Sequence, residues 1–484
     1  MTNFYVTTPI YYANGLPHIG HLITTTIADV LARYYRTILG NNNVFFTTGL
    51  DEHGTTVEES AKKEGFHDYQ GYVDQRAEFW QTAFTKTNIS YDFFVRTTNP
   101  QHEKFTQNFI RKLVKAGDVY KKKYQGKYCY GCEKFLTLSD LNEQGYCQYH
   151  RPDQIIEIEE DNYFFKLSKY SRQVAELIKN ETINIQPLNK RNEILSRIKA
   201  GIEDQSISRP KEKVSWGIEF PDDPGQTIYV WIEALLNYLS SLEINHKQKL
   251  WENSVHIIGK DINWFHNLIW PSMLLSANHP VHKGSFVHSI LNIGGKKISK
   301  SIGNVISPED IVNKYGIDGT RYLLLSNTPY KDDVDVTWES LDTKFNADLA
   351  NGLGNLVARI AKLCENSQLE FPYDRYPDSK PQPESISKSM FDPNLAVLIQ
   401  NYQFNDALNY IWQELIKKSD LYISENEPWN LKGKKLYEVL QTSVENIRRI
   451  AYNLQPLLPE TAKKILSQFV GPAIKSQPPL FPRI

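Results

Sequence analysis

A short turn containing two histidines joins a predicted strand to a long amphipathic helix, and this arrangement limits the fold more than any other feature of the sequence. Residues 4–8 (FYVTT) have the aromatic and β-branched composition of a strand. From Ile19 to Tyr34, apolar residues recur with a period close to 3.6, which predicts a helix with one buried face. A strand followed directly by such a helix is typical of the α/β class.

The turn itself, residues 17–21 (PHIGH), is a candidate phosphate site. His18 and His21 are three residues apart and therefore share one face of the first helical turn. The N–H groups and the positive dipole at a helix start attract phosphate, and a neutral imidazole can donate a hydrogen bond to a phosphate oxygen. Gly20 lets a ligand approach the backbone. Surface or capping histidines would have the same spacing, so the turn alone does not decide the function.

A second candidate phosphate site lies far along the chain, at residues 294–301 (GGKKISKS). This segment follows a strand predicted at residues 285–291. Its glycines, closely spaced lysines and two hydroxyl groups suit a triphosphate. A solvated basic loop is the alternative interpretation.

Three of the four cysteines are clustered with a histidine in the pattern Cys129-x2-Cys132, fourteen intervening residues, Cys147-x2-His150. Three thiolates and one imidazole are the number and type of ligands in a closed tetrahedral zinc site. Four protein ligands leave no open coordination position, so a structural Zn²⁺ is predicted rather than a catalytic one. Unrelated buried cysteines and a surface histidine are the alternative.

Length and charge narrow the class of protein. A chain of 484 residues is expected to form two to four domains. Because 55 basic residues nearly balance 56 acidic residues, any nucleic-acid binding must come from local patches. No apolar run approaches the roughly eighteen residues of a membrane span, and no cleavable apolar segment begins the chain. We therefore expect a cytoplasmic protein without membrane partners.

Polar and aromatic residues follow the other predicted strands. The strand at residues 43–48 runs into GLDEHG, where Asp51 is a candidate to bind an ammonium group, or else a helix cap. Further strands are predicted at residues 226–231 and 255–258. A helix interrupted by Pro271 follows, and its aromatic residues line a ligand site or simply fill the core.

The PHIGH turn and the KISKS loop, in this order, resemble the signature pair of class I aminoacyl-tRNA synthetases. Further segments across nearly the whole chain resemble the methionyl-tRNA synthetase family: YYANG (11–15), DEHG (51–54), YVW (229–231), GKDI (259–262) and WP (270–271). The resemblance implies that methionine and ATP, with Mg²⁺, form methionyl-adenylate, and that the methionyl group passes to the 3′ end of tRNA(Met).

The pattern of predicted strands and helices along the chain, read together with the resemblance, indicates a domain organisation. A Rossmann-type α/β catalytic domain with a parallel sheet would comprise residues 1–118 and 225–325. Residues 119–224 would form an inserted connective domain with the zinc knuckle. Residues 326–484 would form a stem-contact segment and an α-helical anticodon-binding bundle, with helices near residues 338–365, 393–424, 434–454 and 459–469. The sequence ends without resembling an appended dimerisation domain, and a monomer is expected.

Matched position by position, the resemblance also implies site residues. The catalytic groups would be His18, His21, Lys297 and Lys300, and Gly20 and Ser299 would join them in binding ATP. The methionine pocket would consist of Ile10, Tyr12, Asp51, Trp231, Ala234, Tyr238, Ile262, His266 and Trp270. The CAU anticodon would be read by Asn355, Arg359 and Trp429, and Zn²⁺ would be held by Cys129, Cys132, Cys147 and His150.

Three positions depart from the family pattern: Ile298 replaces a common methionine, Leu50 a frequent threonine and Glu233 a frequent aspartate. None removes a phosphate-binding group, but Leu50 and Glu233 leave open the fine geometry of the pocket and whether this is the cell's main enzyme or a second copy. Other functions also remain open: a class I synthetase for another amino acid such as cysteine or leucine, a catalytically silent tRNA-binding homologue, and a zinc-stapled interaction protein.

Overall fold

A six-stranded parallel sheet forms the centre of the computed structural model, which describes residues 1–129, 134–136, 141–147, 152–294, 296–297, 306–373 and 391–484. The strand order is β3-β2-β1-β12-β13-β7, and all five pairings are parallel. The strands are β1 (Phe4–Tyr12), β2 (Val44–Asp51), β3 (Phe93–Arg96), β7 (Asn184–Gln186), β12 (Ser254–Gly259) and β13 (Gly284–His288). The order reverses between β1 and β12, where an open α/β sheet places its ligands.

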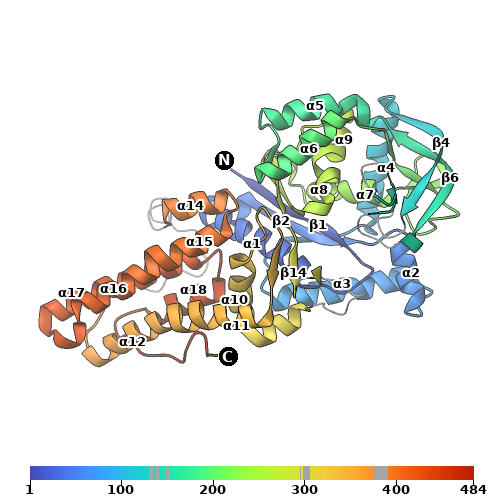
Figure 1. Cartoon of the computed structure of the whole chain (residues 1–484). Helices are drawn as coiled ribbons and strands as arrows, with labels where there is room; N and C mark the ends of the chain where they lie inside the picture. Colours follow the sequence, from blue (N-terminus) through green and yellow to red (C-terminus); the bar gives the residue numbers. More distant parts are fainter. Residues whose placement is uncertain (130–133, 137–140, 148–151, 295, 298–305, 374–390) are drawn as a thin grey trace.

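Helices cover both faces of this sheet (Figure 1). Neighbouring residues of β1 point into different cores: Val6 packs with the core of α1 (Ile19–Leu39) and α10 (Pro308–Ser326), whereas Tyr5 packs with that of α4, α8 and α9. The last three helices are α4 (Pro100–Lys115), α8 (Asn237–Ile244) and α9 (Trp270–Ser276). Burial on both faces explains why the strands read as continuous apolar runs.

The segment expected as an insertion, residues 119–224, begins with a four-stranded antiparallel sheet of order β5-β4-β6-β8. Its strands are β4 (Val119–Cys129), β5 (Lys134–Phe135), β6 (Ile155–Phe165) and β8 (Gln205–Ser206). The same segment then contributes α5 (Leu167–Lys179), the edge strand β7 of the central sheet and α6 (Leu188–Ala200). A three-stranded sheet of β9 (Ser208–Pro210), β10 (Glu219–Phe220) and β11 (Asp223–Ile228) completes it.

Two predicted strands have different ends in the structure. The strand expected at residues 285–291 is split into β13 and β14 (Leu291–Ile293), because the N–H groups of Ser289 and Ile290 bond to Pro329 and Asp333 instead of continuing the sheet. β14 pairs with β15 (Lys296–Lys297) and β16 (Val334–Val336). The strand expected to reach Trp231 ends at Ile228, and α7 (Val230–Leu235) follows at once.

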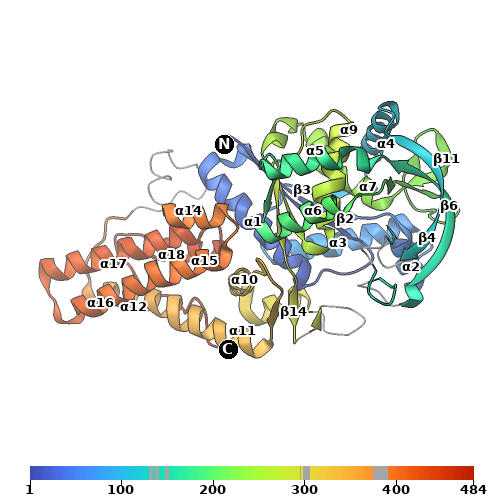
Figure 2. The same cartoon turned by 45° about the horizontal axis from the view of Figure 1, so that its top comes forward.

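The C-terminal part is helical, as the sequence predicts. The helices are α11 (Trp338–Lys344), α12 (Asn355–Ser367), α14 (Pro393–Gln400), α15 (Phe404–Tyr410), α16 (Lys417–Asn426), α17 (Gly433–Leu454) and α18 (Pro459–Gln468), with π-helical segments at Phe345–Gly354 and Ile411–Ile416. Figures 1 and 2 show α12, α16 and α17 extending away from the sheet, on the side opposite β4 and β6. Among the described residues, none of the helices combines the length and hydropathy needed to cross a membrane.

Buried histidines make the core sensitive to acid. Burial lowers the pKa of His102 and of His282 to about 3 and that of His266 to about 4. These imidazoles are therefore neutral in the folded protein at pH values where the unfolded chain, with a histidine pKa near 6.5, binds protons. Neither ring nitrogen of His282 has a hydrogen-bond partner among the described residues.

We predict that the free energy of unfolding falls as the pH drops below 6.5, because each of these histidines then takes up a proton only on unfolding. The loss is about 1.4 kcal/mol per pH unit for each histidine. Urea unfolding at pH 7, 6 and 5 measures it. The variant His282→Leu should lose less stability between pH 6 and 5 than the parent, by about that amount. An identical pH dependence in the two proteins would contradict the prediction.

Candidate functional site

The two histidines of the PHIGH turn cap the helix that they open. The N–H of Gly20 donates to Nδ1 of His18 at 3.0 Å, and the N–H of His18 donates to Nδ1 of His21 at 3.2 Å. The two rings stack with centroids 3.7 Å apart. Because each Nδ1 accepts a hydrogen bond, a neutral ring carries its proton on Nε2, the tautomer that can donate to a phosphate oxygen there.

The chain on either side of the lysine loop (residues 294–305) contacts α1, the helix that this turn opens. At its C-terminal end, the carbonyl of Ile306 accepts a hydrogen bond from the N–H of Ile19 at 3.0 Å. At its N-terminal end, the β14–β15 hairpin follows β13, where His288 Nε2 lies 2.7 Å from Thr24 Oγ1 of α1. Lys297 belongs to β15, whereas residues 298–305, including Ser299 and Lys300, lie outside the described residues. The described residues on both sides of this gap, His288 and Ile306, therefore contact the helix that the turn opens.

Trp80 packs against the PHIGH turn and the residues before it, a role that sequence analysis missed. This buried side chain donates from Nε1 to the carbonyl of Gly15 at 2.9 Å. Its ring stacks on Tyr11 at 4.9 Å and meets His21 at 4.8 Å. A single tryptophan sixty residues downstream has no spacing signal that links it to the turn, and only its apolar character indicates burial.

Asp51 lies at the carboxyl end of β2, beside the end of β1. In the parallel pairing, Asp51 is opposite Tyr12 and Gly49 is opposite Ile10. The carbonyl of Asp51 accepts a hydrogen bond from the N–H of Ala13 at 2.9 Å, and its side chain is buried. Ile10, Tyr12 and Asp51, three of the residues expected to bind methionine, are thus brought to one edge of the sheet.

Aromatic residues from α7 and from the π-helical segment Phe265–Ile269, which comes after β12, stand next to Tyr12. The ring of Trp231 meets Tyr12 edge-on at 5.9 Å and stacks on Phe265 at 4.3 Å. Ala234, one turn along α7 from Trp231, is buried and adds no bulk. The arrangement forms an apolar wall of the kind that packs against a thioether.

Deeper in the protein, Tyr238 and His266 form a buried hydrogen-bonded pair. The hydroxyl of Tyr238 lies 2.6 Å from His266 Nε2, and His266 Nδ1 lies 3.0 Å from the carbonyl of Ile262. A carbonyl can only accept, so Nδ1 carries the proton and Nε2 accepts from the tyrosine hydroxyl. Trp270 lies beside this pair, with its ring centroid 6.2 Å from that of Tyr238.

Trp216 holds the loop that follows Asp51, and sequence analysis missed this contact as well. Its Nε1 donates to the carbonyl of Glu52 at 2.6 Å, and its carbonyl accepts from the N–H of Gly54 at 3.0 Å. Within the same loop, His53 Nδ1 lies 2.5 Å from Glu233 Oε1 on α7. Trp216 and Glu233 are both far along the chain from the DEHG segment that they contact. No sequence motif links residues at such separations.

The residues expected to read the anticodon lie in the distant helical part. Arg359 of α12 bonds to Asp420 Oδ1 at 2.9 Å, and its guanidinium lies 5.4 Å from the ring centroid of Trp429. Trp429 is 53 % exposed, which is unusual for a tryptophan. Asn355 begins α12, one turn before Arg359, and is also exposed.

The expected zinc ligands are described only in part. Cys129 is the last residue of β4, and Cys147 forms an isolated antiparallel β-bridge with Leu141. Both thiols are buried in one small cluster with Leu136. Cys132 and His150 lie outside the described residues.

Comparisons with known proteins agree with the geometry. The family model of class I tRNA synthetases (M) matches residues 4–155 and 146–361. The methionine–tRNA ligase of Caldanaerobacter subterraneus subsp. tengcongensis is 38% identical over 481 residues, covering 96% of this chain and 73% of the relative. That of Synechocystis is 36% identical over 482 residues, covering 96% of this chain and 89% of the relative.

A solved structure has the same fold over the whole chain. The crystal structure of Mycobacterium tuberculosis methionyl-tRNA synthetase bound by methionyl-adenylate has a TM-score of 0.87 and 29% sequence identity, and the match covers 99% of this chain and 100% of that chain. The family match, the curated relatives and the shared fold agree with one another. The chain therefore belongs to the methionyl-tRNA synthetases, within the class I aminoacyl-tRNA synthetases.

Proposed function

We propose that this protein activates methionine with ATP, giving methionyl-adenylate and pyrophosphate, and then transfers the methionyl group to the 3′-terminal ribose of tRNA(Met). The observation that carries the proposal is the hydrogen bond from Ile19 to Ile306, which joins the histidine turn to the end of the lysine loop. A nucleotide bound at this edge of the sheet would meet both segments.

In this proposal the chain supplies no side-chain nucleophile. The methionine carboxylate attacks the α-phosphorus, and the protein contributes positioning and charge stabilisation. His18 and His21 would donate to phosphate oxygens, with Gly20 allowing close approach. Lys297 and Lys300 would neutralise the departing pyrophosphate when their loop closes, Ser299 would help to bind ATP, and Mg²⁺ would accompany ATP.

The methionine pocket would lie between the ends of β1 and β2 and the aromatic wall. Asp51 would bind the ammonium group. Each contact of the thioether with an aromatic ring contributes about 0.3–1.5 kcal/mol, which favours methionine over a branched aliphatic side chain. The lining would consist of Ile10, Tyr12, Trp231, Ala234, Tyr238, Ile262, His266 and Trp270.

The variant Lys300→Ala should slow methionine-dependent pyrophosphate exchange by about 10²–10³-fold while changing the KM for methionine only slightly, because removal of a transition-state charge partner acts on kcat. Exchange should occur with methionine and not with cysteine or leucine. Exchange driven best by another amino acid would overturn the substrate, and a wild-type kcat in Lys300→Ala would remove the role of the lysine.

The exposed Trp429 would stack on an anticodon base beside the cation of Arg359, and Asn355 would contribute a polar edge. Base–aromatic stacking of this kind is worth about 1–3 kcal/mol.

Accordingly, Trp429→Ala should lower kcat/KM for aminoacylation of tRNA by about 10–100-fold and leave methionine-dependent exchange unchanged. A matched control is Val397→Ala on α14, because Val397 is 55 % exposed and also apolar. The control should charge tRNA normally. Equal damage to exchange and charging by Trp429→Ala would contradict the anticodon role.

We also propose a structural Zn²⁺ bound by Cys129, Cys132, Cys147 and His150. The burial of two thiols in one small cluster supports it, because buried structural zinc ligands are typically thiolates from adjacent turns. The ion would tie β4 to the segment before β6. The cytoplasmic location and the monomeric state stay predictions.

Metal analysis of the purified protein should find about one Zn²⁺ per chain. Cys147→Ser should lower this content and the melting temperature together, because binding of structural zinc is coupled to folding. Cys364→Ser is a matched control, since Cys364 is buried in α12, far along the chain from the cluster. Its zinc content should equal that of the wild type. A stable, active and zinc-free wild-type protein would refute the site.

A further inference from the structure

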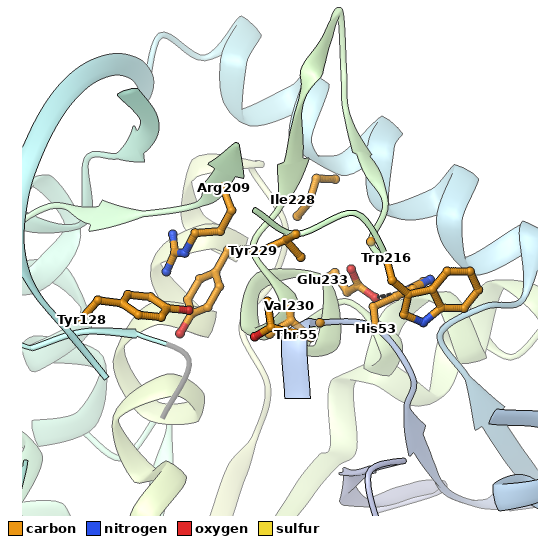
Figure 3. A pocket seen from close by; sticks show the side chains of 12 residues that line it. His53, Thr55, Tyr128, Arg209, Trp216, Ile228, Tyr229, Val230 and Glu233 are labelled. Atoms are coloured by element: carbon orange, nitrogen blue, oxygen red, sulfur yellow. Dashed lines mark hydrogen bonds and ion pairs between the residues drawn. The ribbon is translucent and has the colours of Figure 1, made fainter. Parts of the chain in front are cut away.

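A buried ion pair crosses the crevice beside the proposed methionine pocket. His53 Nδ1 lies 2.5 Å from Glu233 Oε1, and the side chains are 4% and 0% exposed. Glu233 Oε2 has no hydrogen-bond partner among the described residues, so the bond to His53 is the tie that fixes this carboxylate. Figure 3 shows the pair next to Trp216, at one end of a cavity that Arg209 and Tyr229 also line.

The surroundings of His53 favour its charged form. Burial by itself would lower the pKa of His53, but the carboxylate of Glu233, assisted by Glu103 and Glu52, outweighs burial and raises the pKa. Glu103 of α4 lies 4.0 Å from Nε2, on the other side of the ring. His102, the other titratable group near the ring, is neutral because burial lowers its pKa to about 3. The carboxylate of Glu233 therefore favours the charged form of the His53 ring.

The pair connects the two elements that would hold opposite ends of the substrate. His53 is two residues beyond Asp51, in a loop whose backbone is also held by Trp216. Glu233 is two residues after Trp231 and directly before Ala234 on α7. The loop and α7 are separated by 180 residues in the chain, so their spacing depends on contacts across the crevice.

We propose that the His53–Glu233 ion pair is a positioning element that fixes the separation between Asp51 and the α7 residues Trp231 and Ala234, and thereby sets the length of amino-acid side chain that the pocket accepts. The inference rests on the proposed function, because it takes Asp51 as the site of the ammonium group. Neither His53 nor Glu233 needs to touch the substrate.

The energetics of buried charges make such a tie effective. Breaking a buried pair by removing one charge leaves the other uncompensated, so the two groups are held together strongly. The carboxylate and the ring are in direct hydrogen-bond contact. A change of one methylene in the glutamate alters its reach by about 1.5 Å, which is comparable to the difference between methionine and its S-ethyl homologue. Pockets discriminate one methylene by about 10–200-fold.

The test compares Glu233→Gln and Glu233→Asp with the wild type in pyrophosphate exchange, using methionine and ethionine. Glu233→Gln preserves the shape and removes the charge. We expect it to raise the KM for methionine about 10-fold, to change kcat by less than about threefold, and to lower the preference for methionine over ethionine at least about fivefold. Glu233→Asp retains the charge and should show a smaller rise in KM together with altered selectivity.

A pH profile separates positioning from packing. In the wild type, the ion pair is complete below the raised pKa of His53 and is lost as the pH rises through that pKa, so the KM for methionine should rise there. Glu233→Gln removes the main partner, and this increase should disappear. Glu233→Asp should keep it. Titration of the methionine amino group affects all the proteins equally and cancels in the comparison.

Two controls complete the design. Glu181→Gln removes an ion-pair partner of Arg191 at the surface, where the Glu181 side chain is 64% exposed. This variant should leave every parameter unchanged. The double variant His53→Asn/Glu233→Gln should raise the KM no further than the more affected single variant, because both substitutions break one interaction. Melting temperatures show whether each variant folds. If Glu233→Gln does not fold, Glu233→Asp and His53→Asn test the proposal instead.

The possible outcomes are distinct. A wild-type protein that does not activate methionine overturns the proposed function. A wild-type protein that does so, combined with unchanged KM, selectivity and pH profile in the folded Glu233 variants, overturns the positioning role alone. A loss confined to kcat also overturns it, because displacement of pocket walls acts on substrate binding.

Discussion

The adjacency of β1 and β12 is the constraint on which the rest of the site depends. Tyr5 pairs with Ser254, so these strands are neighbours in space although a large part of the chain separates them. Because the chain leaves β1 and β12 toward opposite sides of the sheet, their carboxyl ends border an open crevice. The helix with the histidines begins at the carboxyl end of β1, and its first residue, Ile19, donates to the carbonyl of Ile306, the first described residue after the lysine loop. Each motif alone has an ordinary explanation, and the proposed nucleotide site rests on the contact between the turn and the chain that follows the lysine loop.

A buried ion pair fixes the histidine helix relative to the helical part of the chain. Asp29 of α1 lies 2.7 Å from Arg321 of α10, and Nε of Arg321 donates to the carbonyl of Leu457 at 2.8 Å, between α17 and α18. Thus the guanidinium of Arg321 contacts both α1, the helix that begins at the PHIGH turn, and the connection between α17 and α18. Because such a buried charge is costly to leave unpaired, the helix and the bundle have a fixed relative position.

Features set by local sequence were predictable, whereas those set by distant contacts were not. The helix of residues 19–39 follows from its apolar period, and the helical C-terminal part follows in the same way. The three residues of β7 are too few to show a pattern. The strand break after His288 depends on Asp333, and the support of the turn depends on Trp80, so neither can be read from neighbouring residues. Most assigned pocket residues came from family resemblance, because spacing does not distinguish a pocket aromatic from a core aromatic.

Glu233 illustrates why short motifs define chemistry better than they define specificity. In the sequence it is one acidic residue between expected pocket residues, and its difference from the common aspartate leaves open the fine geometry of the pocket. In the structure its longer side chain reaches His53 across the crevice, so its length bears directly on the distance between two walls. The proposed phosphate-binding groups belong to single short segments of sequence, and each segment can be recognised by its own motif. A pocket built between separate elements requires a contact that fixes the distance between those elements. In our proposal, the two residues of that contact then determine which amino-acid side chain the pocket accepts.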